Sequence, residues 1–265
     1  MEAVNRFFIE DGHLDSTKNF NDEGNDKDKV IYEVMRIING KPLFLEAHLK
    51  RMEKSFELMK KGFSYEYNKI GEYVEKVICA NDRKDGNLKI TFNIEKDEMK
   101  VFYIKHSYPT EEMYRNGVKT ILYHGERKNP NAKVMDGEFR GKVNEKIKKE
   151  NAFEAILVDG NGCITEGSKS NIFLIKGDRV LTSKVEAVLP GVTRGEIINI
   201  CNRAGIDFEE RDINYKELEE VDSMFISGTS PGILPISKVD NISMDINNKI
   251  MRRLMDLYND AVEKI

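Results

Sequence analysis

The stretch Ile164-Thr165-Glu166-Gly167-Ser168-Lys169-Ser170-Asn171-Ile172-Phe173 decides how the second half of this chain is interpreted. It places a carboxylate, Glu166, at the end of one predicted strand and an amide, Asn171, at the start of the next. An apolar run over 172–175 follows directly, which predicts a buried strand. Polar side chains crowded between two such strands are either ordinary turn residues or part of a site.

Two other segments carry groups that would complement this turn. Lys133 lies in Asn131-Ala132-Lys133-Val134, which we expect to open a helix, and apolar neighbours would favour the nucleophilic free base of its amine. Pro190-Gly191-Val192-Thr193-Arg194 predicts a glycine turn that opens another helix, where unpaired N–H groups and the helix dipole favour an anion. A lysine that forms an imine, an acid for a ring nitrogen and a phosphate-binding turn are the parts that a pyridoxal phosphate enzyme needs.

Each of these residues also has an ordinary structural interpretation. A lysine is usually solvated, as we expect for the charged stretch that contains Lys142, Lys146, Lys148 and Lys149. Glu166 alone could be a turn carboxylate. Three neighbours could be turn-capping residues: Ser168, Ser170 and Asn171. Thr193 could be a plain N-cap, which would not exclude phosphate binding. Arg51 lies off the apolar stripe of its helix, so position alone predicts a surface arginine.

The composition excludes several classes of protein. The 265 residues include 42 basic and 46 acidic side chains, a net charge of −4, which argues against a general nucleic-acid-binding protein. Cys79, Cys163 and Cys201 are far apart, and neither they nor the four histidines show metal-ligand spacing. We therefore expect reduced thiols in a cytoplasmic protein without a metal site. We expect that the N-terminal segment is not a signal peptide, and no apolar run in the sequence approaches the roughly 20 residues of a membrane span.

The predicted elements divide the chain into two α+β parts with a site between them. The first part, residues 1–124, is expected to hold a polar loop over 11–29 and helices over 46–61 and 65–80, the first with a core stripe. Its strands are expected over 30–38, 43–45, 88–94, 99–104 and 118–123. A polar linker over 125–132 contains Pro130. The second part, residues 133–265, is expected to hold helices over 136–149 and 193–203, a C-terminal amphipathic helix, and strands over 153–158, 171–175, 180–181, 208–213 and 224–226.

A series of motifs follows these elements along the chain. They are Tyr32-Glu33-Val34-Met35-Arg36, Leu45-Glu46-Ala47-His48-Leu49-Lys50-Arg51-Met52, Lys133, Phe153-Glu154-Ala155-Ile156-Leu157, Thr165-Glu166-Gly167 with Asn171, Gly191-Val192-Thr193-Arg194 and Ser227-Gly228-Thr229. Together they resemble the class IV aminotransferases, the fold-type IV pyridoxal phosphate enzymes. That family includes branched-chain aminotransferases, D-amino acid aminotransferases and aminodeoxychorismate lyases.

The resemblance implies a fold and a set of roles. The fold has a smaller N-terminal α/β sandwich and a larger C-terminal pseudo-barrel domain, with the active site between them and completed across a homodimer interface. Lys133 matches the catalytic lysine that holds pyridoxal 5'-phosphate, and Glu166 matches the acid that keeps the ring nitrogen protonated. The other residues implied to bind the cofactor are Arg51, Ser170, Asn171, Val192, Thr193 and Thr229.

The substrates are implied less closely. We expect transfer of an amino group between a branched-chain-like or D-amino acid and a 2-oxo acid. Several family members bind the substrate carboxylate with an arginine of the small domain, but no arginine occurs here between Arg83 and Arg115. Recognition is therefore expected to involve Tyr32, Arg36, or the turn at Thr229 and Ser230.

Two alternatives to the aminotransferase remain at this stage. One is an aminodeoxychorismate lyase, which releases 4-aminobenzoate and pyruvate and needs no oxo-acid acceptor. The other is a catalytically silent binding or regulatory relative. Retention of both Lys133 and Glu166 argues against the silent relative.

Overall fold

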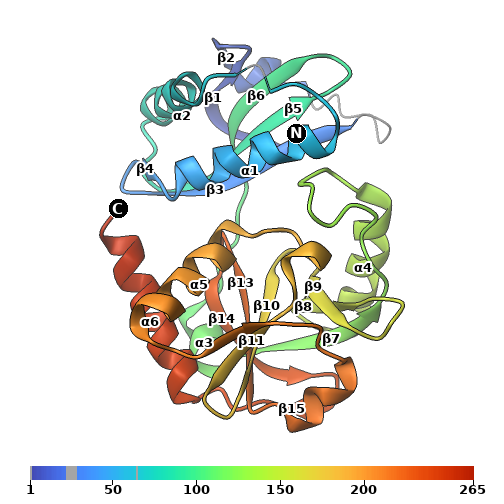
Figure 1. Cartoon of the computed structure of the whole chain (residues 1–265). Coiled ribbons are helices and arrows are strands. Elements are labelled where there is room, and N and C mark those ends of the chain that lie inside the picture. The colour runs from blue at the N-terminus through green and yellow to red at the C-terminus, as the bar shows by residue number, and fades with distance from the viewer. Residues whose placement is uncertain (1, 22–28, 64) are drawn as a thin grey trace. The chain divides into compact units, whose positions relative to one another are not determined.

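The computed structural model describes residues 2–21, 29–63 and 65–265, and it divides the chain into two compact units. The first unit comprises Met1–Ser107, Ala132–Met135 and Ile265, and the second comprises Tyr108–Asn131 and Asp136–Lys264. Each unit combines helices with one large sheet (Figure 1). The expected α+β class is confirmed.

The first unit has a six-stranded sheet in the order β2-β1-β6-β5-β3-β4. Its strands are β1 (Ala3–Glu10), β2 (His13–Ser16), β3 (Val30–Ile38), β4 (Lys41–Pro42), β5 (Gly86–Asn93) and β6 (Glu98–Ile104). Helices α1 (Leu45–Leu58) and α2 (Tyr67–Asn81) pack on one face and share a core with it. The predicted stripe of α1 is buried at Leu49, Met52 and Phe56, as its helical spacing requires.

The second unit has a nine-stranded sheet in the order β12-β11-β10-β13-β14-β7-β8-β9, with β15 paired to β14. Its strands are β7 (Val118–His124), β8 (Glu154–Val158), β9 (Ile164–Gly167), β10 (Asn171–Lys176), β11 (Arg179–Thr182), β12 (Phe208–Glu210), β13 (Ser223–Gly228), β14 (Gly232–Val239) and β15 (Ile242–Ser243). Its α-helices are α3 (Glu111–Asn116), α4 (Gly137–Lys149), α5 (Val192–Ala204) and α6 (Lys249–Glu263). Strands β8, β9, β10 and β13 are almost wholly buried, so their ends can present polar groups in a dry setting.

The boundary between the units differs from the expected one. Strand β7 was expected in the first unit, but it pairs in parallel with β8 and β14 in the second sheet. Lys133 was expected in the second unit, but residues 132–135 belong to the first. Nothing in the local sequence specifies these long-range pairings, because strand partners are chosen by tertiary packing.

Two smaller expectations near the N-terminus are also wrong. The predicted loop over 11–29 contains β2 and a 3₁₀ turn, Thr17–Asn19, while its residues 22–28 lie outside the described part of the chain. The expected strand partner over 43–45 is replaced by β4, and Leu45 already begins α1.

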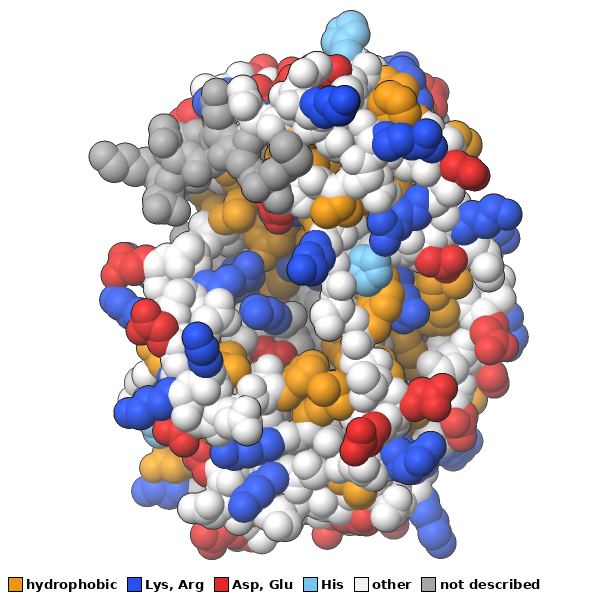
Figure 2. All heavy atoms as spheres, turned by 180° about the vertical axis from the view of Figure 1, so that it is seen from behind, with side chains coloured by type: hydrophobic (Ala, Val, Ile, Leu, Met, Phe, Trp, Pro, Cys, Tyr) orange, Lys and Arg blue, Asp and Glu red, His pale blue; other side chains and the backbone are white. Residues whose placement is uncertain are grey.

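The surface carries both signs of charge. Figure 2 shows acidic and basic side chains interspersed over one face of the protein, in keeping with the nearly balanced composition. Among the described residues, no helix combines the length and the apolar character that crossing a bilayer would require.

Candidate active site

Lys133 lies in an extended segment beside β3. The Tyr32 N–H donates to the Lys133 carbonyl at 3.1 Å, and the Met135 N–H donates to the Val30 carbonyl at 3.1 Å. The predicted helix begins only at Gly137, so the expectation that Lys133 opens it is wrong. The Lys133 ammonium lies 4.7 Å from the centroid of the Tyr32 ring. Strand pairing on one side and an aromatic face on the other thus position this amine.

Arg51 is buried, so the expectation of a surface arginine is wrong. Its Nε donates to Glu33 Oε1 at 2.8 Å and its Nη2 donates to Glu33 Oε2 at 2.6 Å. His48 Nδ1 lies 2.7 Å from Glu33 Oε2. Glu33 comes from β3, while His48 and Arg51 are one turn apart on α1, which packs on that strand. The planar guanidinium fork matches a carboxylate with two parallel bonds, which orients Arg51 rigidly.

The three groups hold defined charges. Burial alone would raise the pKa of the Glu33 carboxyl, but the Arg51 guanidinium and hydrogen bonds from Arg51 and His48 outweigh it and lower this pKa to about 2. Burial lowers the pKa of the His48 imidazole, more than Glu33 raises it. A neutral His48 that donates from Nδ1 to Glu33 fits this geometry.

Glu33 is expected to make stability depend on acid pH. Because its pKa is about 2 in the folded chain and ordinarily 4.5, its contribution is full above pH 4.5 and is lost as the pH falls through about 2. This difference corresponds to about 3 kcal/mol at neutral pH. The free energies of unfolding of the wild type and of Glu33→Gln, measured in urea, should therefore differ at neutral pH. This difference should become smaller as the pH falls below 4.5. A difference in the free energy of unfolding that does not change with pH would contradict this role of Glu33. The control is Glu46→Gln, because Glu46 forms an exposed ion pair with Lys50.

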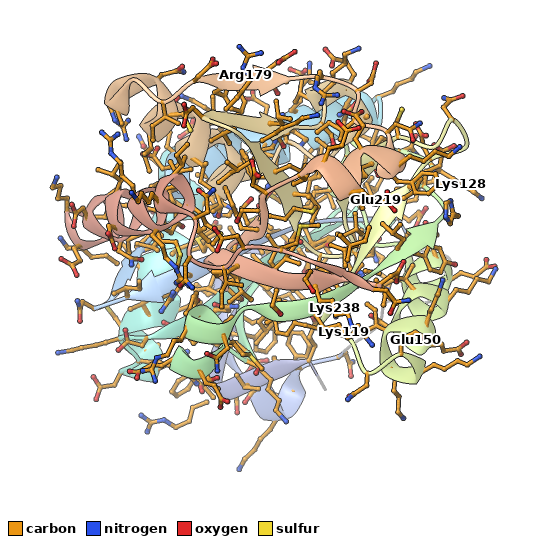
Figure 3. The ribbon with its side chains drawn as sticks, turned by 90° about the horizontal axis from the view of Figure 1, so that it is seen from below. Lys119, Lys128, Glu150, Arg179, Glu219 and Lys238 are labelled. Atoms are coloured by element: carbon orange, nitrogen blue, oxygen red, sulfur yellow. The ribbon has the colours of Figure 1, made fainter. Side chains whose placement is uncertain are left out.

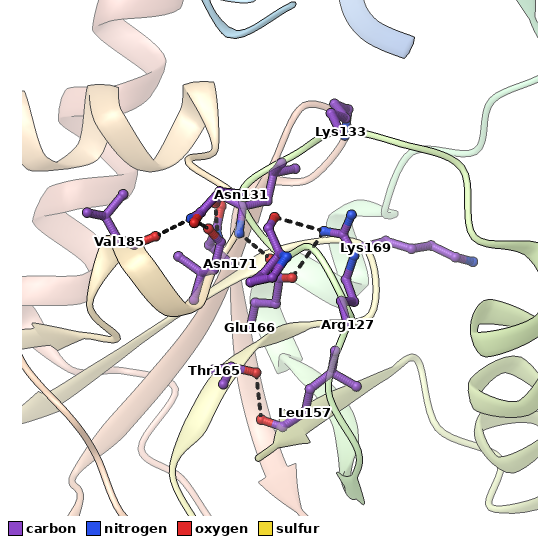
Figure 4. A network of polar contacts seen from close by, with 12 residues as sticks. Arg127, Asn131, Lys133, Leu157, Thr165, Glu166, Lys169, Asn171 and Val185 are labelled. Atoms are coloured by element: carbon purple, nitrogen blue, oxygen red, sulfur yellow. Dashed lines mark hydrogen bonds and ion pairs between the residues drawn. The ribbon is translucent and has the colours of Figure 1, made fainter. Parts of the chain in front are cut away.

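Glu166 lies one residue before the end of β9 and is buried in the second unit. Its Oε1 accepts from Arg127 Nη1 at 3.2 Å, and its Oε2 accepts from the Leu189 N–H at 2.9 Å (Figure 4). A carboxylate has about four acceptor sites and can therefore accept from several donors at once. Each oxygen of this carboxylate thus accepts from a protein donor.

Asn171 supports the loop that leads to α5. Its Nδ2 donates to the Leu189 carbonyl at 2.9 Å, and the Asn131 Nδ2 donates to the carbonyls of Val185 and Val188, each at 2.7 Å (Figure 4). Gly191 is the N-cap residue of α5 and provides no side-chain cap, so Thr193 is not the N-cap that sequence position allowed. The first N–H groups of such a helix lack helical partners and favour an anion.

Gly191 is needed for its lack of a side chain, not for its backbone angles, since its φ is −63°. A Cβ at this position would lie 2.0 Å from Asn171 Oδ1. We expect Gly191→Ala to destabilise the fold by about 1–3 kcal/mol and to weaken pyridoxal phosphate binding, because Asn171 or the helix start must shift.

The matched control for this prediction is Gly195→Ala on the same helix. A Cβ on Gly195 meets nothing within 4 Å, so this change should stabilise the fold by about 0.5–1 kcal/mol. Urea unfolding and cofactor titration of both variants give the comparison. If the two variants had the same stability and the same cofactor affinity, the close approach of Gly191 and Asn171 would contribute to neither.

The turn between β9 and β10 is organised by a residue that sequence reasoning used only as part of a strand. Glu154 on β8 is buried and accepts hydrogen bonds from Ser168 Oγ at 2.6 Å, from the Lys169 N–H at 2.7 Å and from Ser170 Oγ at 3.1 Å. Burial raises the pKa of Glu154, and these three donors counter it in part. The Ser170 hydroxyl therefore has a protein partner, and its predicted contact with a cofactor stays a prediction.

The second turn of interest follows β13. Ser227 is buried at the end of that strand, directly opposite Asn171 of β10, and its Oγ has no hydrogen-bond partner within the described part of the chain. Thr229 and Ser230 form the turn into β14 and are half-buried. A buried hydroxyl without a partner is costly, so it marks a place where a ligand group can bind.

The residues fit pyridoxal phosphate by their chemistry. The second unit offers an uncapped helix start for a dianion and a buried carboxylate for a cationic ring nitrogen. The unpartnered Ser227 hydroxyl adds a donor. The first unit offers a lysine beside an aromatic face and a buried arginine.

The second unit also has a groove lined mainly by charged side chains. This shallow groove of about 250 Å³ beside β11 and β12 is lined by Lys176, Arg179, Leu181, Glu209 and Arg211. Arg179, labelled in Figure 3, pairs with Asp207 and Glu209 at 2.7 and 3.0 Å. Lys176 and Arg211 likewise pair with acidic side chains. The cations are thus neutralised by their own neighbours.

Several residues of these networks were not singled out from the sequence, among them Glu33, Glu154 and Arg127. A detectable signal exists for Glu33 and Glu154, because each is the single acid of a mostly apolar strand. Arg127 lies in a polar stretch, and nothing local distinguishes it from its neighbours.

Comparison with known proteins gives a consistent picture. A sequence model of the family described as Amino-transferase class IV matches residues 30–239. The D-alanine aminotransferase of Bacillus licheniformis is 27% identical, over 79% of this chain and 78% of that protein. The aminodeoxychorismate lyase of Bacillus subtilis is 24% identical, over 80% and 78%. The solved branched-chain amino acid aminotransferase of Escherichia coli has a TM-score of 0.85 at 18% identity, covering 96% of this chain and 93% of that one, which shows the fold.

Proposed function

Because the chain belongs to the class IV aminotransferases, we propose that it binds pyridoxal 5'-phosphate and moves an amino group from an amino acid to a 2-oxo acid. The observation that carries the proposal is the buried carboxylate of Glu166, held by Arg127 and by a backbone N–H. Such a group suits a cationic ring nitrogen, and a plain turn residue would not need burial.

The proposal assigns a role in cofactor binding to several residues. In this proposal Arg51, the start of α5 at Val192 and Thr193, and the turn at Thr229 receive the phosphate. Glu166 accepts a hydrogen bond from the protonated ring nitrogen. Ser170 and Asn171 keep the β9–β10 turn in place, as their contacts with Glu154 and the Leu189 carbonyl indicate.

The reaction divides between the cofactor and the chain. When bound, the cofactor supplies an electron sink for the negative charge that develops at the substrate α-carbon. Lys133 Nζ binds the cofactor between turnovers and, once released, takes the proton from the substrate α-carbon. Arg127 shares the negative charge of Glu166 and thereby limits how strongly that acid holds the ring proton.

We propose D-alanine as the first donor to test, because several D-alanine aminotransferases are among the relatives, at 27–28% identity. The purified chain is loaded with pyridoxal phosphate and mixed separately with D-alanine, L-leucine and L-glutamate. Loss of the visible absorbance of the bound cofactor with one donor, and its return with a 2-oxo acid, supports transamination. Pyruvate release from aminodeoxychorismate without an acceptor would identify a lyase, the activity named for one relative.

We also propose a cytoplasmic homodimer. The three cysteines are free, which suits a reducing compartment. Sedimentation equilibrium of the loaded protein at several concentrations tests the assembly, and a monomer at every concentration would contradict the proposal.

A further inference from the structure

One face of the six-stranded sheet gathers two lysines around one aromatic ring. In the antiparallel pair β3–β5, Tyr32 is opposite Thr91 and Val34 is opposite Lys89, so Tyr32 and Lys89 lie on the same face. The antiparallel bridge between Ile31 and Val134 places Lys133 opposite Tyr32, on that face as well. The other face, which includes Ile31 and Met35, packs against α1.

The two ammonium groups approach the same ring. Lys133 Nζ is 4.7 Å and Lys89 Nζ is 5.3 Å from the Tyr32 centroid. The two nitrogens are therefore at most about 10 Å apart, the sum of these two distances. Lys89 also lies 6.0 Å from the Phe102 centroid. Aromatic faces attract a cation, so the Tyr32 and Phe102 rings favour an ammonium group at this position.

Lys89 is buried and already binds a carboxylate. Its side chain is only 4% exposed, and its Nζ donates to the two oxygens of Glu2 at 2.6 and 2.8 Å. Glu2 is 39% exposed and precedes β1, which begins at Ala3, so it lies outside the strand ladder. A buried ammonium needs an anionic partner, and Glu2 provides it from outside the strand ladder.

We infer that Lys89 binds a carboxylate group of the amino acid substrate, and that the Glu2 carboxylate occupies this position until substrate displaces it. The inference rests on the proposed aminotransferase activity, because it assigns Lys133 to the amino end of the same substrate. An ammonium presents a point charge, so it accepts a carboxylate at one oxygen or two.

The test compares steady-state kinetics of the full chain loaded with pyridoxal phosphate, using whichever of D-alanine, L-leucine and L-glutamate reacts. Lys89→Met should raise KM for that donor by roughly 10- to 100-fold, the value of a charged hydrogen bond, while kcat changes less than about threefold. Lys89→Arg should restore most of the affinity, because it restores the cation. Glu2→Gln should lower KM several-fold, because a neutral amide competes less well.

Lys100→Met is the matched control. Lys100 of β6 is opposite Thr91, so it lies on the same face, is also buried, and pairs with Glu10 and Glu98 at 2.9 and 2.8 Å. Its loss should lower the melting temperature without changing KM. A second measure of affinity is a titration of the loaded protein with donor in the absence of a 2-oxo acid. It gives the donor concentration at which half of the absorbance change of the bound cofactor has occurred.

The outcomes separate the two claims. An unchanged KM in Lys89→Met, or a fall in kcat alone, would overturn the role of Lys89, and an unchanged or raised KM in Glu2→Gln would overturn that of Glu2. A wild-type protein that converts none of the three donors would overturn the proposed function, and the Lys89 assignment with it. This last result is recognised in the wild type alone, so the two failures are distinct.

Discussion

Lys133→Ala is expected to abolish transamination, lowering kcat/KM by at least about 1,000-fold. In the proposed mechanism, the variant loses both the amine that binds the cofactor and the base that moves the α-proton. The fold should survive, because the segment is held by the backbone bonds between residues 30–32 and 133–135. The measurement is the rate of oxo-acid formation with the reacting donor, together with the melting temperature.

Lys142→Ala is the control for Lys133. This second lysine, on α4, is 63% exposed and pairs with Glu138, so its loss should leave the rate within about twofold. Lys133→Arg keeps the cation near Tyr32 but not a nucleophilic amine, and it should be as inactive as the alanine variant. Activity that survives in Lys133→Ala would refute the assignment of this residue.

Glu166→Gln is expected to have the second largest effect, lowering kcat by about 100-fold with little change in KM. A neutral amide cannot hold the ring nitrogen in its cationic form. The change also leaves Arg127 without its charged partner, so some loss of stability should accompany it. Steady-state rates and the pH dependence of the cofactor absorbance measure the two effects.

Glu154→Gln is the matched comparison for Glu166. Both carboxylates are buried on neighbouring strands, but Glu154 binds the backbone and hydroxyls of the 168–170 turn. Its amide should retain part of this network, and kcat should fall less than about tenfold. A similar loss in the two variants would show that Glu166 acts through the turn and not through the cofactor.

Periodicity was sufficient for the elements with a clear buried face. The strand predicted over 30–38 is β3, and the helix predicted over 46–61 is α1 within a few residues. The hairpin β5–β6 was found because two apolar runs flank a polar turn over 95–98. The α+β class and the aminotransferase family follow from these elements and from the order of the motifs, and both are confirmed.

The strands that were not predicted from the sequence lack the regular pattern by which strands are recognised. Strand β14 contains Pro235 and lies between β13 and β7, although proline lacks the N–H that an inner strand normally donates. Its register shifts between Ile236 and Lys238, directly after the proline. Strand β1 carries Asn5 in the left-handed region, with φ 73°, inside another register shift. Such irregular strands are stabilised by their neighbours and not by their own pattern.

For the candidate site too, some residues could be predicted from the sequence and others could not. Glu166, Asn171 and the α5 start could be located because turn and strand ends lie where the local sequence changes. The partners could not, since Arg127 and Glu166 are 39 residues apart and Glu33 and Arg51 are 18 apart. Lys89 gave no signal because it resembles any strand lysine until its burial is known.

The most direct test of the account is the position at which pyridoxal phosphate attaches to the chain. The purified protein is incubated with the cofactor, reduced with borohydride to make the attachment permanent, digested and analysed by mass spectrometry. The account predicts the phosphopyridoxyl group on Lys133 and its absence from that peptide in Lys133→Ala. Attachment to another lysine, or none above the level of Lys133→Ala, would contradict the central claim.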